Sequence, residues 1–259
     1  MDRDERLRRA WDPERFRSDG HALIDQLADH LAASLARPET PVYAARDPDA
    51  LLAEVSTDYR EPVPLAELLA SVRSRAVHQH HPRCVGHQVA APLPAAALAD
   101  LQSSLLNNGM ASYESGPISS VLERQLARWL TRALGWPTGA DGFLTSGGTL
   151  GNLTALLAAR QAKSSGDAWR DGSRERLCVI ASEHAHYCVA RAVQVMGWGA
   201  GGTVLVPMDA AYRMDASALP RAIASARANG RRPIAVVASA GASPTGNIDP
   251  LPAIADVCA

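Results

Sequence analysis

Apolar residues recur at helical spacing along the first part of the chain. From Pro13 to Ala36 they come three or four residues apart, and a second stretch of this kind covers residues 65–77. The sequence therefore predicts helices over residues 1–75, with an extended loop between them and no strand. Because these helices cannot bury their apolar stripes alone, we expect them to pack on the rest of the chain or on a second copy of it.

The pattern changes after Pro94. Long helical runs over residues 95–106 and 118–134 precede short apolar segments that alternate with helices. The predicted strands are residues 142–145, 177–182, 202–207 and 233–240, and the predicted helices are residues 149–162, 186–195, 215–228 and one that begins near Pro250. Strands that are apolar throughout are typical of a parallel sheet covered on both faces, so the sequence predicts an α/β domain.

Composition and charge exclude several classes of protein. With 47% hydrophobic and 20% charged residues, the 259-residue chain is typical of a soluble globular protein. No apolar run approaches the roughly 18 residues of a membrane span, and the charged first segment favours a cytoplasmic protein. A net charge of -1 without a basic stripe argues against nucleic-acid binding and favours a small-molecule ligand.

The segment FLTSGGTLGNLTALLAARQA, residues 143–162, is the first candidate for chemistry. A predicted strand runs into Gly147 and Gly148, and a helix opens at Thr149. Glycines let the backbone approach a ligand, and the free N–H groups of a helix N-terminus favour an anion such as phosphate. A plain tight turn with a threonine cap has the same local pattern. The dinucleotide-binding and P-loop fingerprints do not occur.

The segment IASEHAHYCVARA, residues 180–192, carries His184 and His186 where the second predicted strand ends. Ligands usually bind at this edge of a parallel sheet. No acidic cluster accompanies the histidines, and the four cysteines form no C-x-x-C pair, so we predict no metal site and no disulfide framework. We interpret the cysteines as small core residues and HQHHP, residues 78–82, as a solvated helix end.

The segment SAGASPTGNIDPL, residues 239–251, follows the fourth predicted strand. Its small residues would let a flat ligand lie close to the sheet, and we interpret Asp249 as the cap of the following helix. No G-x-S-x-G string occurs in the chain, which disfavours a hydrolase with a nucleophile elbow.

Together these segments resemble the group II pyridoxal-phosphate-dependent amino-acid decarboxylases, the family of the aromatic amino-acid, glutamate and 2,4-diaminobutyrate enzymes. The strings HPRCVGHQVAAPLP, LLNNGMASYESGPISSVLE, TSGGTLGNLTALLAAR, SEHAHYCVARA and SAGASPTGNIDPL occur in the family's order. The resemblance implies an N-terminal helical dimerisation segment in residues 1–75. It implies the aspartate-aminotransferase-like large domain of fold type I in residues 76–259, with pyridoxal phosphate as cofactor and a homodimer as the assembly.

The resemblance also implies the cofactor site, residue by residue. Gly148 and Thr149 would hold the cofactor phosphate, and Ser243 would lie beside the cofactor. His186 would stack on the pyridine ring and is the residue matched to catalysis. A stacked imidazole can also hydrogen-bond the substrate carboxylate and so orient the bond that breaks.

Two further positions, Gln88 and Asn107, match residues near the substrate carboxylate in glutamate-type relatives. The resemblance thus implies decarboxylation of an L-amino acid by the complete family enzyme, and the identity of that amino acid stays open. Two alternatives also stay open: a catalytically inactive fragment that binds only a partner chain or phosphate, and another pyridoxal-phosphate reaction on the same fold.

The chain departs from the family at its end. The family's aspartate that pairs with the pyridine nitrogen and its Schiff-base lysine both fall beyond Ala259, so we expect a truncated large domain and no activity from this chain alone. The only lysine is Lys163, about 14 residues and roughly 20 Å of helical rise beyond Thr149. We therefore expect Lys163 to be a solvated helix-end residue.

Overall fold

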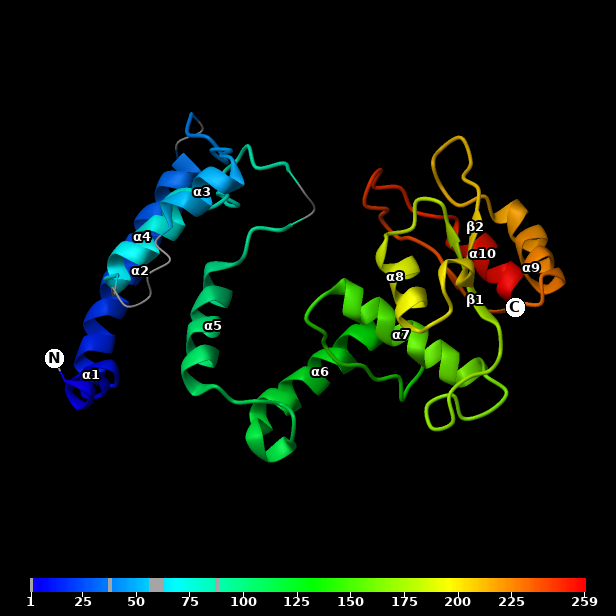
Figure 1. Ribbon diagram of the computed structural model, residues 1–259, viewed down its shortest axis with the longest axis horizontal. Helices are drawn as coiled ribbons and strands as arrows, with labels where there is room; N and C mark the ends of the chain where they lie inside the picture. Colours follow the sequence, from blue (N-terminus) through cyan, green and yellow to red (C-terminus); the bar gives the residue numbers. More distant parts are fainter. Residues whose placement is uncertain (1, 37–38, 56–62, 87–88) are drawn as a thin grey trace. The chain divides into compact units, whose positions relative to one another are not determined.

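The computed structural model describes residues 2–36, 39–55, 63–86 and 89–259 (Figure 1). Contacts within the chain divide it into two compact units, Met1–Asn107 and Asn108–Ala259. The boundary at residue 75 stays a prediction, because contacts inside one chain do not define a dimerisation segment. No helix in the described ranges is both long and apolar enough to cross a membrane.

The first unit is helical. Its helices are α1 (Arg3–Ala10), α2 (Pro13–Ala36), α3 (Pro48–Glu54), α4 (Leu65–Arg75) and α5 (Pro94–Leu106). The prediction for α2 is confirmed residue for residue, and those for α4 and α5 are confirmed to within a turn. The extended loop predicted before α4 is wrong in part, since it contains α3. That helix begins because the Asp47 carboxylate accepts hydrogen bonds from the amides of Asp49 and Ala50, both at 3.0 Å.

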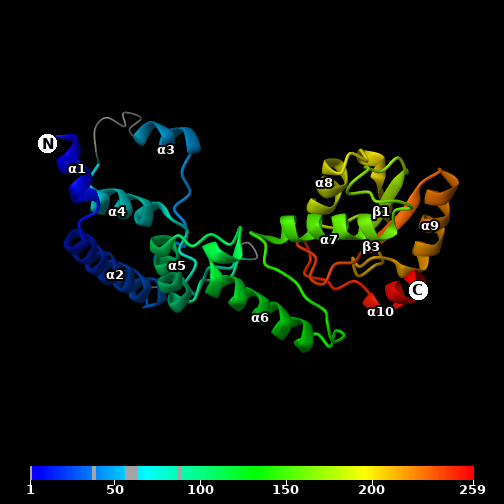
Figure 2. The ribbon, with the colours of Figure 1, turned by 90° about the horizontal axis from the view of Figure 1, so that it is seen from below.

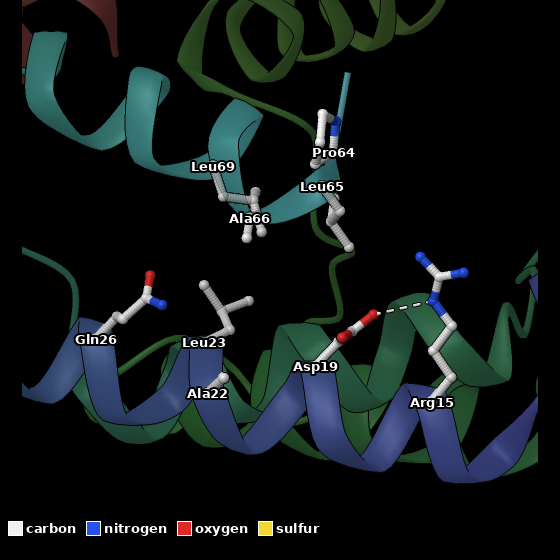
Figure 3. A pocket seen from close by; sticks show the side chains of 9 residues that line it. All are labelled: Arg15, Asp19, Ala22, Leu23, Gln26, Pro64, Leu65, Ala66 and Leu69. Carbon is white, nitrogen blue, oxygen red and sulfur yellow. Dashed lines mark hydrogen bonds and ion pairs between the residues drawn. The ribbon is translucent and has the colours of Figure 1, made fainter. Parts of the chain in front are cut away.

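A groove of about 230 Å³ lies between α2 and α4 (Figure 3). Short apolar side chains from both helices face one another across it, and the ion pair of Arg15 with Asp19 lies at one end, with an N–O distance of 3.4 Å. The apolar lining consists of Ala22, Leu23, Leu65, Ala66 and Leu69. Among the described residues of this unit only Ser34 and His81 are buried. The apolar stripes of these helices therefore remain largely uncovered within the chain.

The HQHHP segment is not a solvated helix end, so that interpretation is wrong. Helix α4 stops at Arg75, and His81 is only 3% exposed. The Nδ1 atom of His81 accepts a hydrogen bond from the amide of Arg83 at 3.1 Å, and Nε2 of His80 lies 2.8 Å from the carbonyl oxygen of Pro92. These two imidazoles lie within hydrogen-bond distance of backbone atoms of the chain, and residues 78–80 are half-buried.

The second unit contains a parallel α/β sheet. It begins with the 3-10 turn η1 (Tyr113–Ser115) and α6 (Pro117–Ala133). The remaining elements are α7 (Gly148–Lys163), β1 (Leu177–Ser182), α8 (Cys188–Val195), η2 (Ala200–Gly202), β2 (Thr203–Val206), η3 (Ala216–Ala218), α9 (Leu219–Ala228), β3 (Arg232–Val237) and α10 (Leu251–Cys258). The strands are parallel in the order β2-β1-β3, which confirms the predicted α/β class.

Helices cover both faces of this sheet, as predicted (Figures 1 and 2). All six residues of β1, the central strand, are buried. Leu177, Val179 and Ala181 pack in one core with residues of α7 and α8. Ile180 points the other way and packs with Leu219 of α9 and with α10. The alternation of a strand's side chains thus supplies both cores from one continuously apolar segment.

Two strand predictions need correction. Residues 142–145 form no strand, because their amides bond to carboxylates instead of to a neighbouring strand: Leu144 donates to Glu123 at 2.8 Å and Gly142 to Asp141 at 2.9 Å. Strand β3 ends three residues earlier than predicted, at Val237. Beyond that point the amide of Ser239 donates to the carboxylate of Asp249 instead of to a neighbouring strand.

The interpretation of the cysteines as core residues is confirmed for two of them. Cys178 and Cys188 are buried, Cys84 is half-buried, and Cys258, the last residue of α10, is exposed, so the interpretation is wrong there. Burial raises the pKa of the Cys178 thiol, and the nearby positive charge of Arg231 opposes this rise. A thiol in such surroundings is held neutral and unreactive.

Candidate functional site

The N-terminus of α7 offers unpaired backbone donors. The carbonyl of Gly147 accepts from the amides of Leu150 and Gly151, both at 3.1 Å, which closes the first turn. The amides of Gly148 and Thr149 find no acceptor among the described residues, and no side chain caps this helix end. The threonine cap that was the alternative for this segment does not form, because the helix starts one residue before Thr149.

Neither the backbone conformation nor the packing of the chain requires glycine at positions 147 and 148. The φ of Gly147 is 166°, an extended conformation open to any residue, and a Cβ added to either glycine would meet no atom within 4 Å. Gly202 differs, because its Cβ would lie 2.6 Å from Val193 and 2.7 Å from Trp198. Packing accounts for glycine at 202, whereas at 147 and 148 the glycines leave space in front of the free amides of α7. That space suits an anion that approaches the backbone closely.

His186 lies at the start of α8 with one ring nitrogen engaged. Its Nδ1 accepts a hydrogen bond from the amide of Cys188 at 3.3 Å, and its carbonyl accepts from the amide of Val189 at 3.0 Å. Because an amide can only donate, Nδ1 is the bare nitrogen and Nε2 carries the hydrogen. The side chain is exposed. Its Nε2–H edge is therefore a donor available to a ligand.

The starts of α7 and α8 meet through one side-chain contact. Nδ2 of Asn152, one turn into α7, donates to Sγ of Cys188 at 3.1 Å. Gly148 precedes Asn152 by a single turn of helix, and His186 precedes Cys188 by two residues. The structure thus brings Gly148 and Thr149, the candidates for binding phosphate, to the same end of the packed helices α7 and α8 as the imidazole of His186.

The loops after β2 and β3 are joined by a buried carboxylate. Asp249 is 5% exposed and accepts from the amides of Ser239 and Met214, each at 2.7 Å. The first turn of α10 receives no side-chain cap, so the interpretation of Asp249 as a helix cap is wrong. Because β1 and β3 are parallel neighbours, the loops that follow them open at one edge of the sheet. Asp249 therefore joins the loops after β2 and β3 at the end of the sheet where the loop with His186 also begins.

His184 is engaged by a different partner from His186. Its ring stacks on Tyr212 in the loop after β2, with centroids 6.1 Å apart and planes within 4° of parallel. Its Nδ1 is buried without a hydrogen-bond partner among the described residues. In the same loop Arg213 pairs with Asp209 at 2.7 Å, and this hydrogen bond, with those from backbone amides, holds the pKa of Asp209 below its ordinary value. No pattern in the sequence points to Tyr212.

Three further site residues were predicted, namely Ser243, Asn107 and Gln88. Ser243 is exposed in the loop after β3. Asn107 belongs to the first unit, where it ends α5 in the left-handed conformation, with φ 47°, and its amide bonds to the carbonyl of Ser103 at 2.9 Å. Gln88 lies outside the described residues. The substrate roles of Asn107 and Gln88 stay predictions.

Lys163 is the last residue of the 16-residue helix α7 and is exposed. About 22 Å of helical rise separate it from Gly148, so its placement as a remote helix-end residue is confirmed. In the part of the chain that the structure describes, no three His, Cys, Asp or Glu residues are placed to hold a metal ion.

Comparison with known proteins shows the family of this chain. Residues 64–259 match the pyridoxal-dependent decarboxylase conserved domain. The chain belongs to the pyridoxal-dependent decarboxylase family. The chain is 32% identical over 207 residues to L-2,4-diaminobutyrate decarboxylase of Acinetobacter baumannii, and the match covers 74% of this chain and 41% of that protein. It is 30% identical over 250 residues to the aromatic-L-amino-acid decarboxylase of Bacillus atrophaeus, covering 95% and 50%.

The fold of the chain matches that of solved relatives. The crystal structure of mouse CSAD superposes with a TM-score of 0.86 at 25% identity, covering 95% of this chain and 53% of that chain. The fold type I large domain expected from the sequence is thereby confirmed. The chain spans about half the length of the relatives it matches.

Proposed function

We propose that the protein decarboxylates an L-amino acid with pyridoxal phosphate as cofactor, and that residues of this chain hold the cofactor. The observation that carries the proposal is the open, donor-lined start of α7 beside His186, in a chain of a pyridoxal-dependent decarboxylase family. When bound, pyridoxal phosphate supplies an electron sink for the electron pair that the departing carboxylate leaves behind.

The start of α7 fits the phosphate of that cofactor. The amides of Gly148 and Thr149, which have no acceptor among the described residues, lie at the positive end of a 16-residue helix dipole. Glycine at 147 and 148 leaves the approach to these donors open. Ser243, in the loop after β3 at the same unit's sheet edge, would lie beside the cofactor.

His186 would bind the ring and orient the substrate. A face of the imidazole would stack on the pyridine ring, and Nε2–H would donate a hydrogen bond to the substrate carboxylate. Such a hydrogen bond would help to orient the bond that breaks. Gln88 and Asn107 match positions near the substrate carboxylate in glutamate-type relatives, and we propose that they bind the substrate.

The proposal includes a homodimer in which residues 1–75 contact the second copy. Supporting it, α2 and α4 carry large apolar side chains that this chain leaves exposed: Leu27 is 43%, Leu68 50% and Val72 62% exposed. A second copy that covered them would bury apolar surface, which is the main driving force of association.

Hydrogen exchange tests the phosphate site. Pyridoxal phosphate should protect residues 147–152 of the chain from exchange, and inorganic phosphate should compete with it. Gly148→Ala keeps the amide but adds a methyl group in the open space beside it, so it should hinder the approach of the phosphate and weaken binding about tenfold or more, the size of one charge-assisted hydrogen bond. The control is Gly166→Ala in the loop that follows the far end of α7, where an added Cβ also meets open space and binding should be unchanged. Equal protection by pyridoxal, which has no phosphate, would contradict the proposal.

A further inference from the structure

Tyr187 lies directly against the imidazole of His186. The two ring centroids are 4.2 Å apart and their planes are tilted by 38°. On the first turn of α8 the guanidinium carbon of Arg191 lies 4.8 Å from the centroid of the Tyr187 ring, and the Arg191 amide donates to the Tyr187 carbonyl at 3.0 Å. Guanidinium, phenol and imidazole therefore form a row, in which each aromatic ring is in contact with the next group.

Packing in the core does not explain this tyrosine. Its side chain is 59% exposed, whereas Cys188 and Val189, the next two residues, are 1% and 3% exposed. The ring contacts that the structure shows for Tyr187 are those with His186 and Arg191. The contact with His186 is therefore the feature of this tyrosine that calls for an explanation.

We propose that Tyr187 is a positioning residue that fixes the ring plane of His186, with Arg191 holding Tyr187 in turn. The amide of Cys188 restrains His186 only at Nδ1, and a ring held by one edge can still swing about that edge. Contact with Tyr187 adds a restraint from the side of the ring. Together the two leave the opposite face and the Nε2–H edge free. The inference rests on the proposed function, because that free face is where the cofactor ring would stack.

The first test needs no ligand. In the chain labelled with ¹³C and ¹⁵N in histidine, Tyr187→Leu should shift and broaden the imidazole signals of His186 and leave those of His184 unchanged. Tyr187→Phe keeps the ring and should preserve the His186 signals. Because Tyr187 is 59% exposed, neither variant should lower the thermal midpoint appreciably. Unchanged His186 signals in Tyr187→Leu, or a lower midpoint as its only effect, would overturn the positioning role.

The second test uses pyridoxamine 5'-phosphate, which has no aldehyde and so cannot react with an amine of the chain. Tyr187→Leu should weaken its binding between about twofold and tenfold, the range for loss of one aromatic pair, and Tyr187→Phe should change it less than about twofold. Binding by Tyr187→Leu as tight as or tighter than wild type would mean that Tyr187 does not support the stacking face.

His186→Ala and His184→Ala separate this inference from the proposed function. The proposed function expects His186→Ala to weaken binding far more than His184→Ala, and equal losses would contradict its assignment of His186. A loss in His186→Ala without a loss in Tyr187→Leu would leave the proposed function standing and overturn the role of Tyr187.

Discussion

The two units of the chain bury their apolar side chains to different degrees. In the second unit every residue of β1 is buried, and helices cover both faces of the sheet. In the first unit, α2 and α4 expose large apolar side chains, and among its described residues only Ser34 and His81 are buried. A continuously apolar strand thus predicts its own covering layers, because both of its faces need them. An amphipathic helix predicts only that something covers one face.

The largest expected effect comes from truncating one apolar side chain in each unit. Ile180→Ala in β1 should destabilise the second unit by about 2 to 5 kcal/mol, since it leaves a cavity in a fully buried site. Leu68→Ala in α4, where the side chain is 50% exposed, should cost less than about 1 kcal/mol in the isolated chain. Hydrogen exchange of the β1 and α4 amides measures the two costs separately.

Equal costs for the two variants would remove the contrast between the units. A cost for Leu68→Ala that rises with protein concentration would sharpen it, because a second copy would then be covering α4.

A smaller effect is expected from Asp249→Asn. The amide side chain keeps the shape but offers one accepting oxygen for the amides of Ser239 and Met214, so one buried donor loses its partner. The second unit should lose about 1 to 3 kcal/mol, and exchange of these two amides should accelerate. Asp209→Asn is the matched control, since its carboxylate is solvated and pairs with Arg213 at the surface. Equal acceleration in both variants would show that Asp249 has no special role in joining the loops.

The smallest expected effect is a pH dependence confined to the first unit. The rings of His30 and His78 lie 5.0 Å apart. Burial, followed by the neighbouring His78, Arg73 and His80, lowers the pKa of His30 from its ordinary value of 6.5. The unfolded chain then binds this proton at a higher pH than the folded unit does. The stability due to neutral His30 is complete above pH 6.5 and falls as the pH drops toward the lowered pKa.

His30→Gln should therefore flatten the loss of helicity of the first unit between pH 7 and about pH 5, the region around the ordinary histidine pKa. His21→Gln, at an exposed position of the same helix, should leave the pH profile as in wild type. A profile equally steep in His30→Gln would assign the acid sensitivity to another group.

The elements predicted best are those whose signal is contained in the element itself. α2 shows its helical spacing over 24 residues, and β1 is an unbroken apolar run, so both were predicted to the residue. α1 and α3 were missed because their carboxylate caps, Asp2 and Asp47, produce no apolar pattern. Residues 142–145 have the composition of a strand, but a strand needs a paired neighbour, and composition does not encode the neighbour.

The same limit applies to the site. Gly148, Thr149 and His186 stand in short recognisable strings, and the structure brings them to adjacent helix ends. Asn152 and Asp249 act through partners 36 and 35 positions away in the chain, which no local string reveals. The sequence does show an aromatic residue, Tyr187, directly after the candidate histidine. Its role could not be inferred without the structure, because only the fold shows that its side chain is exposed.

The remote placement of Lys163 has a practical consequence for optical work on this chain. α-Amino groups lose their proton at a lower pH than lysine side chains do, so they can be capped first near neutral pH. Lys163 is then the single amine left for a dye, since the sequence holds no other lysine. A fluorophore there would be separated by about 22 Å of helix from the amides of Gly148. That separation suits energy transfer from a fluorescent occupant of the site, and the dye itself would not touch the occupant.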